Sequence, residues 1–151
     1  VTYTGPAQGT PAKLENEAGA KERELRRSLE AFHGKADPKA LDAAWPHLGS
    51  PDRFLRHAAR VAVEWQPVDT WKAKALAEAH PQAALNALTA LARYGDPKEQ
   101  PALLAALEKL PFDKLSRDQK LEKYRVLQLA FIRQGPPAGG AKKLLAEVGA
   151  G

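Results

Sequence analysis

The sequence contains no cysteine and no methionine, and only 7% of its 151 residues are aromatic. The lack of cysteine excludes disulfides, thiolate nucleophiles, cysteine-ligated zinc and covalently attached haem within this chain, but it leaves the redox compartment undecided. No apolar run is long enough to predict a membrane-spanning helix, so we expect no membrane insertion. Because the chain begins at Val1 and not at an initiator methionine, we expect a processed protein or a segment of a longer one.

The residues that are present are rich in alanine and leucine and poor in strand formers, which predicts an all-α fold. The hydrophobic share of 44% and the charged share of 27% are ordinary for a folded domain. A net charge of +5 is mildly basic and compatible with polyanion binding, although many proteins that bind no polyanion carry a similar charge.

The apolar residues follow a helical period from about Lys21 onward. The pattern predicts helices over 21–33, 37–48, 52–66, 69–79, 82–94, 101–110 and 117–134, with a further short helix over 142–148. Two signals support these bounds: Ser50 or Asp52 can cap the helix 52–66, and Ser116 and Gln119 match a capping box. Pro46, in contrast, should kink the helix 37–48 or end it before residue 48.

One side of the helix 52–66 is lined by alanine, at Ala58, Ala59 and Ala62, which lets a neighbouring helix come close. The helices pair as 37–48 with 52–66, 69–79 with 82–94, and 101–110 with 117–134. We therefore predict a right-handed α-solenoid of about three helix pairs, with the helix 21–33 as an N-terminal cap. The predicted core is Leu25, Leu29, Phe32, Leu41, Trp45, Leu48, Leu55, Ala58, Ala59, Ala62, Leu76, Leu85, Leu88, Leu91, Leu104, Leu107, Tyr124, Leu127 and Phe131.

The segment Pro51-Asp52-x-x-Leu55-Arg56-x-Ala58-Ala59-x-x-Ala62 resembles the second helix of a HEAT repeat, and residues 36–135 share that likeness. The resemblance implies that Asp52 and Arg56 have a structural role, bonding along the stacked turns. In the next unit Gln82 and Asn86 stand at the corresponding places, which weakens the match. The implied domains are a short strand and linker over 1–20, a HEAT-like domain over 21–135, and a linker or short helix over 136–151.

A narrower resemblance is carried by the segments 29–35, 44–48 and 52–56. They are similar to helical-repeat segments of large exported bacterial proteins, where a propeller resembling sugar dehydrogenases precedes the repeats and a c-type cytochrome domain follows. This resemblance implies that residues 1–4 are a trailing propeller strand. It also favours an exported or periplasmic location over a cytoplasmic one.

Basic and aromatic residues mark one candidate binding surface, made of Arg26, Arg27, Arg53, Arg60, Trp65 and Trp71. Arginines on one face would attract phosphates, and tryptophans can stack a base or a sugar. The alternatives favoured here are a solvated helix surface, because acidic residues are interspersed, and tryptophans that fill the gaps beside small alanines.

No catalytic motif is present, and the four histidines lack the helical spacing of a metal site. We therefore expect no catalytic, cofactor-binding or metal-binding residues. The predicted function is a non-catalytic interaction or spacer module that contacts a protein or neighbouring domains of the same chain, with nucleic acid an unlikely partner. The alternative is a nucleic-acid-binding domain similar to HEAT-like alkylpurine DNA glycosylases, which place an aspartate, tryptophans and arginines on a concave basic surface.

Overall fold

The computed structural model describes residue 5, residues 18–137 and residues 141–149. Within these residues the chain is all-helical and has no strand, which confirms the all-α prediction. The α-helices are α1 (Ala20–Glu30), α2 (Ala40–Ala44), α3 (Arg53–Glu64), α4 (Lys72–Ala77), α5 (Pro81–Tyr94), α6 (Gln100–Glu108), α7 (Arg117–Gln134) and α8 (Lys142–Gly149). Short 3-10 turns follow at Trp45–His47, Val68–Thr70, Pro97–Glu99 and Phe112–Lys114. The strand expected over 1–4 lies outside the described residues.

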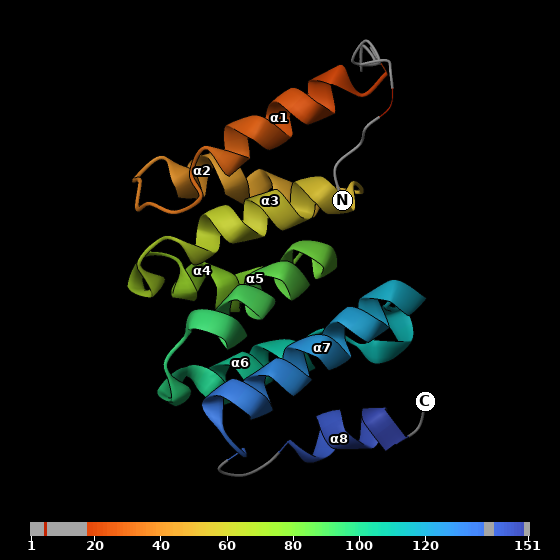
Figure 1. The fold of residues 1–151 in the computed structure, drawn as a ribbon. Helices are drawn as coiled ribbons and strands as arrows, with labels where there is room; N and C mark the ends of the chain where they lie inside the picture. The colour runs from red at the N-terminus through yellow and green to blue at the C-terminus, as the bar shows by residue number, and fades with distance from the viewer. Residues whose placement is uncertain (1–4, 6–17, 138–140, 150–151) are drawn as a thin grey trace.

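The helices form two layers (Figure 1). Helices α1, α3, α5 and α7 lie side by side, each in contact with the next, and we call them the front layer. Helices α2, α4 and α6 form the rear layer, where α2 packs on α3, α4 on α5, and α6 on both α5 and α7. The three predicted helix pairs are therefore in contact, and α8 lies at the far end of the stack beyond α7 (Figure 1).

Local signals fix several helix ends. The Asp52 carboxylate accepts a hydrogen bond from the Phe54 backbone N–H at 2.7 Å and so caps α3. Ser116 and Gln119 form the predicted capping box at the start of α7. After α1, Gly34 turns the chain at a φ of +82°, a backbone conformation that residues with a side chain rarely adopt.

Two predicted helices are shorter in the structure. Helix α2 ends at Ala44 and passes into a 3-10 turn, because Pro46 has no N–H to continue the helical ladder. The predicted helix 69–79 contributes only α4, because the backbone becomes extended at Glu78. The Glu78 carboxylate there accepts hydrogen bonds from Trp45 Nε1 at 2.8 Å and from the His80 backbone N–H at 2.9 Å. The end of α4 thus coincides with the hydrogen bond between Glu78 and Trp45, which begins the 3-10 turn after α2.

The alanine stripe of α3 is buried as predicted, with Ala58, Ala59 and Ala62 at most 2% exposed. The other predicted core residues are buried or packed against the core, apart from half-buried Tyr124, whose hydroxyl donates to the Glu147 carbonyl at 2.9 Å. Close packing of small residues explains how α1, α3 and α5 approach one another.

A buried lysine fastens α7 to the segments around it. The Lys123 side chain is 2% exposed and donates hydrogen bonds to the Leu110 carbonyl at 2.8 Å and to the Glu147 carboxylate at 2.6 Å. Burying an ammonium group is costly unless it is paired in this way. Lys123 therefore acts in the fold, by connecting α7 to α8 and to the end of α6.

Candidate binding surface

Arginine is confined to the front layer, whereas lysine is found in both layers and in the loops. The arginines are Arg23, Arg26 and Arg27 in α1, Arg53, Arg56 and Arg60 in α3, Arg93 in α5, and Arg117, Arg125 and Arg133 in α7. Arginine presents a planar fork of N–H donors that suits carboxylates and phosphates. The arrangement therefore gives one layer a distinct capacity to bind anions.

A small polar pocket opens where α3, α5 and α7 meet. Its volume is about 240 Å³, and its walls are Arg60, Asn86, Thr89, Arg93, Glu122, Arg125 and Leu129. We call this site the arginine pocket. One arginine comes from each of the three helices, so the pocket exists only when these helices pack together.

A buried carboxylate holds two of the pocket's arginines in place. The Glu64 side chain is 3% exposed and pairs with Arg60, four residues earlier in α3, and with Arg93 Nε of α5 at 3.0 Å. Arg60 also lies 3.1 Å from His57 Nδ1. Burial and the nearby Arg60 charge lower the pKa of His57 below its ordinary value, so His57 is neutral at pH 7 and adds no charge to the pocket.

The other side of the pocket is formed by α7. The Glu122 carboxylate lies 3.7 Å from Arg56 and accepts a hydrogen bond from the Gln82 amide. Arg125 donates to the Gln128 amide oxygen at 2.6 Å, so its partner is neutral. Arg125 therefore projects a charge that no carboxylate of the described residues balances directly.

Of the two residues predicted to bond along the turns, Asp52 bonds within its own turn, whereas Arg56 bonds there and also lies 3.7 Å from the Glu122 carboxylate of α7. Asp52 caps α3, and Arg56 Nη1 donates to the Ser50 and Pro51 carbonyls at 2.7 and 3.0 Å. A link to the preceding unit is made instead by Asn86 of α5, whose amide donates to the Leu48 carbonyl at 3.2 Å. Asn86 thus ties α5 to the end of the turn that follows α2.

The remaining residues of the predicted surface do not form one cluster. Arg26 pairs with Glu30 on α1 at 3.1 Å, Arg27 is exposed, and the Arg53 guanidinium lies 4.8 Å from the Phe54 ring centroid. Trp65 is half-exposed at the end of α3.

The complete burial of Trp71 removes it from the candidate surface and agrees with the favoured interpretation that the tryptophans fill gaps. Its indole Nε1 donates to the Gln66 carbonyl at 3.1 Å, and its ring belongs to the hydrophobic core. Trp45 is also buried, while Trp65 is half-exposed. The three tryptophans therefore do not combine into a stacking platform.

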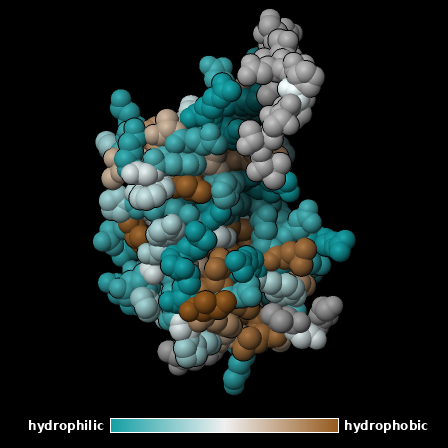
Figure 2. All heavy atoms as spheres, in the orientation of Figure 1, coloured by the Kyte–Doolittle hydropathy of each residue, from teal (hydrophilic) through white to brown (hydrophobic). Residues whose placement is uncertain are grey.

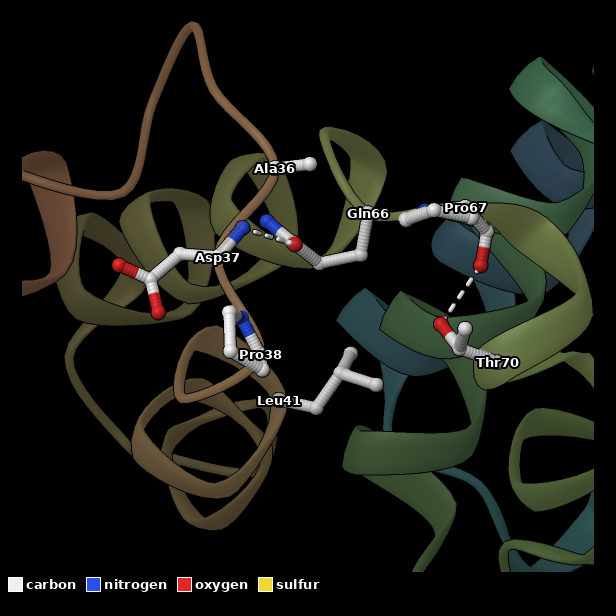
Figure 3. Close-up of a pocket in the computed structure, with 7 residues that line it drawn as sticks. All are labelled: Ala36, Asp37, Pro38, Leu41, Gln66, Pro67 and Thr70. Carbon is white, nitrogen blue, oxygen red and sulfur yellow. Dashed lines mark hydrogen bonds between the residues drawn. The ribbon is translucent and has the colours of Figure 1, made fainter.

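A second opening, of about 390 Å³, is apolar and lies between the loop before α2 and the loop after α3 (Figure 3). Its polar side chains serve the two loops. The Gln66 amide oxygen accepts from the Asp37 backbone N–H at 2.8 Å, and the Thr70 hydroxyl donates to the Pro67 carbonyl at 2.6 Å. These bonds fasten the loops and leave mainly Pro38, Leu41 and Pro67 to line the opening (Figure 3).

The histidines are bonded individually. His33 Nε2 lies 2.9 Å from the Ala58 carbonyl, and His80 Nδ1 accepts from the Ala83 backbone N–H. In the described part of the chain, no group of three or more histidine, cysteine, aspartate or glutamate residues is placed to hold a metal ion.

Comparison with family models, with curated proteins and with solved structures gave no match. Among the described helices, none is both long enough and apolar enough to cross a membrane.

Proposed function

We propose that this chain is a non-catalytic interaction module that recognises a protein partner, or a neighbouring domain of its own chain, through the front layer. The observation that carries the proposal is the confinement of every arginine to α1, α3, α5 and α7. Arginine is enriched at protein interfaces because it combines charge, directional donors and a long apolar stem.

The exposed apolar side chains of α7 support the same proposal. Leu121 and Ile132 are 58% and 69% exposed, and they lie four residues before and seven residues after Arg125. This spacing places all three residues on one face of α7. Figure 2 shows hydrophobic residues gathered mainly in the lower half of the view, where α6 and α7 lie, below a more hydrophilic area over α1 and α3. A surface that mixes arginine with exposed apolar residues suits a protein partner.

The fold that would present this surface is a HEAT-like α-solenoid with α1 as its N-terminal cap. Its support is a set of bonds from α5 and α7 to the preceding helix pair. Asn86 bonds to the Leu48 carbonyl, and Gln134 of α7 donates to the Leu91 carbonyl of α5 at 3.0 Å. Arg133 donates to the Arg93 carbonyl at 2.9 Å. Partners separated by about one helix pair in sequence are typical of repeat proteins, in which each unit contacts its neighbours.

Nucleic-acid binding by the same layer is the second candidate, favoured by its arginines. The layer also holds Glu30, Glu64 and Glu122, each beside an arginine. The side chains of Glu30 and Glu122 are 43% and 35% exposed and interrupt the positive surface, so a continuous phosphate backbone would have to pass over them. The interaction module is therefore the function that the geometry favours.

Site-directed photo-crosslinking in the full-length protein tests the proposal. A photoreactive amino acid replaces Ile132 on the front layer or Ala105, an exposed residue of α6 in the rear layer. From position 132 we expect either a discrete crosslink to a partner protein, suppressed by excess unlabelled protein, or a discrete crosslink to a neighbouring domain of the same chain, which excess unlabelled protein leaves unchanged. We expect no crosslink from position 105. Crosslinks from neither position, or from position 105 alone, would refute recognition through the front layer.

A further inference from the structure

We infer that the arginine pocket binds a single carboxylate side chain of an acidic, partly apolar protein segment. This inference rests on the proposed interaction function and specifies the chemistry of the partner. It depends on four properties of the pocket: its charge, its preorganised donors, its size and its apolar margin.

Positive charge exceeds negative charge around the pocket. The charged groups are four arginines and two glutamates: Arg56, Arg60, Arg93 and Arg125, with Glu64 and Glu122. Four guanidinium charges against two carboxylate charges leave an excess of two positive charges. His57, the other titratable neighbour of Arg60, is neutral at pH 7. An added anion would therefore meet a favourable local potential.

The arginine donors are positioned before any ligand arrives. The Glu64 carboxylate, whose side chain is 3% exposed, pairs with both Arg60 and Arg93. Arg93 uses Nε for this pair, and within the described residues its two Nη groups have no hydrogen-bond partner. Guanidinium Nη groups can bind a carboxylate in a bidentate fashion. A preformed donor fork loses less conformational entropy on binding than a mobile side chain.

The size of the pocket limits what can enter. Its volume of about 240 Å³ lies below the roughly 300–1,000 Å³ typical of pockets for small-molecule ligands, so it suits one side chain. Asn86 and Thr89 add neutral polar groups to the wall, and Leu129 adds an apolar one. A glutamate or aspartate side chain offers both a carboxylate and a short apolar stem for these surfaces.

The margin of the pocket favours a protein segment over a nucleic acid. Leu121 and Ile132 flank Arg125 on the same face of α7 and are largely exposed. Apolar residues beside the carboxylate of a peptide could cover them, whereas a phosphodiester backbone offers no matching apolar groups.

The test uses a short fluorescein-labelled peptide of alternating glutamate and leucine, and the full-length protein. Fluorescence anisotropy measures binding in about 150 mM salt, where exposed charges more than about 8 Å apart are largely screened. Two variants of α7 each remove one positive charge: Arg125→Gln changes the pocket, and Arg117→Gln changes an exposed site outside it. A peptide with glutamine in place of glutamate and a single-stranded oligonucleotide of similar length are the ligand controls.

We expect Arg125→Gln to weaken binding of the acidic peptide about tenfold, the effect of losing one charge-assisted contact, while Arg117→Gln changes it less than about twofold. The resonances of the arginine Nε–H groups at positions 60, 93 and 125 should shift on titration of the peptide. Equal losses in the two variants, binding of the glutamine peptide, or tighter binding of the oligonucleotide would each overturn the inference. If the acidic peptide fails to bind while the crosslink from position 132 persists, the interaction module stands and this ligand class is wrong.

Discussion

Two arginine–glutamate pairs of the front layer have the same helical spacing but differ in burial. Arg60 and Glu64 in α3 have side chains 15% and 3% exposed, whereas Arg26 and Glu30 in α1 have side chains 41% and 43% exposed. Both pairs place the arginine four residues before the glutamate. Glu64 also pairs with Arg93, so comparing the two sites measures the combined effect of burial and of this second pair.

We predict that Glu64→Gln lowers the free energy of unfolding by about 1.5–3 kcal/mol, the value typical of hydrogen bonds to charged groups. Glutamine has nearly the same size, so no cavity forms, but its neutral amide leaves Arg60 and Arg93 without a counter-charge. The loss should be below the roughly 3–5 kcal/mol of a fully buried pair, because Arg93 is 37% exposed and water can reach it. Glu30→Gln should cost at most about 1 kcal/mol.

Urea unfolding followed by far-UV circular dichroism measures both losses, provided that the slope with urea is unchanged between variants. For a chain of this size Glu64→Gln should lower Tm by roughly 3–12 °C. About 1 M salt should remove the effect of Glu30→Gln, because the screening length falls to about 3 Å, and should leave most of the effect of Glu64→Gln. Equal losses in the two variants would refute the reasoning that burial strengthens the Glu64 pairs.

Three further predictions concern packing, pH and salt. Ala59→Leu should cost about 1–3 kcal/mol by overpacking a fully buried position, and unchanged stability in urea would argue against close packing there. Burial alone would raise the pKa of Glu78, but hydrogen bonds from the His80 backbone and from Trp45 outweigh it and keep the pKa below its ordinary value of 4.5. Glu78 should therefore stabilise the fold above about pH 4.5 and lose that contribution as the pH falls, a loss that urea titrations of Glu78→Gln should not show. Duplex DNA should bind at most weakly, with binding gone by about 150 mM salt in an anisotropy titration; binding that survives would favour the nucleic-acid alternative.

The helices could be predicted because their signals are local. Helix α7 begins and ends within a residue of the predicted bounds, since a capping box precedes it and Gly135 follows at a φ of +93°. The burial of Ala58, Ala59 and Ala62 followed from their spacing alone. Such patterns involve residues only three or four positions apart, so they can be recognised in the sequence without knowledge of the tertiary contacts.

The errors arise where a distant residue decides the outcome. The end of α4 coincides with a bond between Glu78 and Trp45, which are 33 residues apart. Trp71 is one of the candidate surface residues, and its complete burial agrees with the favoured interpretation, in which the tryptophans fill gaps beside small alanines. The burial of Lys123 also depends on distant residues, because its partners Leu110 and Glu147 belong to other segments of the chain.

The arginine pocket also depends on packing, yet the sequence contains one trace of it. Arg60, Arg93 and Arg125 are separated by 33 and 32 residues, close to the length of one helix pair. Of these three arginines, only Arg60 belongs to the predicted candidate surface, because arginine is locally densest in α1 and α3. Where helix pairs stack in register, side chains spaced by the length of one pair lie on the same face of the stack. Side chains that are close together within one helix point in different directions around it. Spacing at the length of one helix pair therefore indicates better than local density which arginines of this chain meet in one pocket.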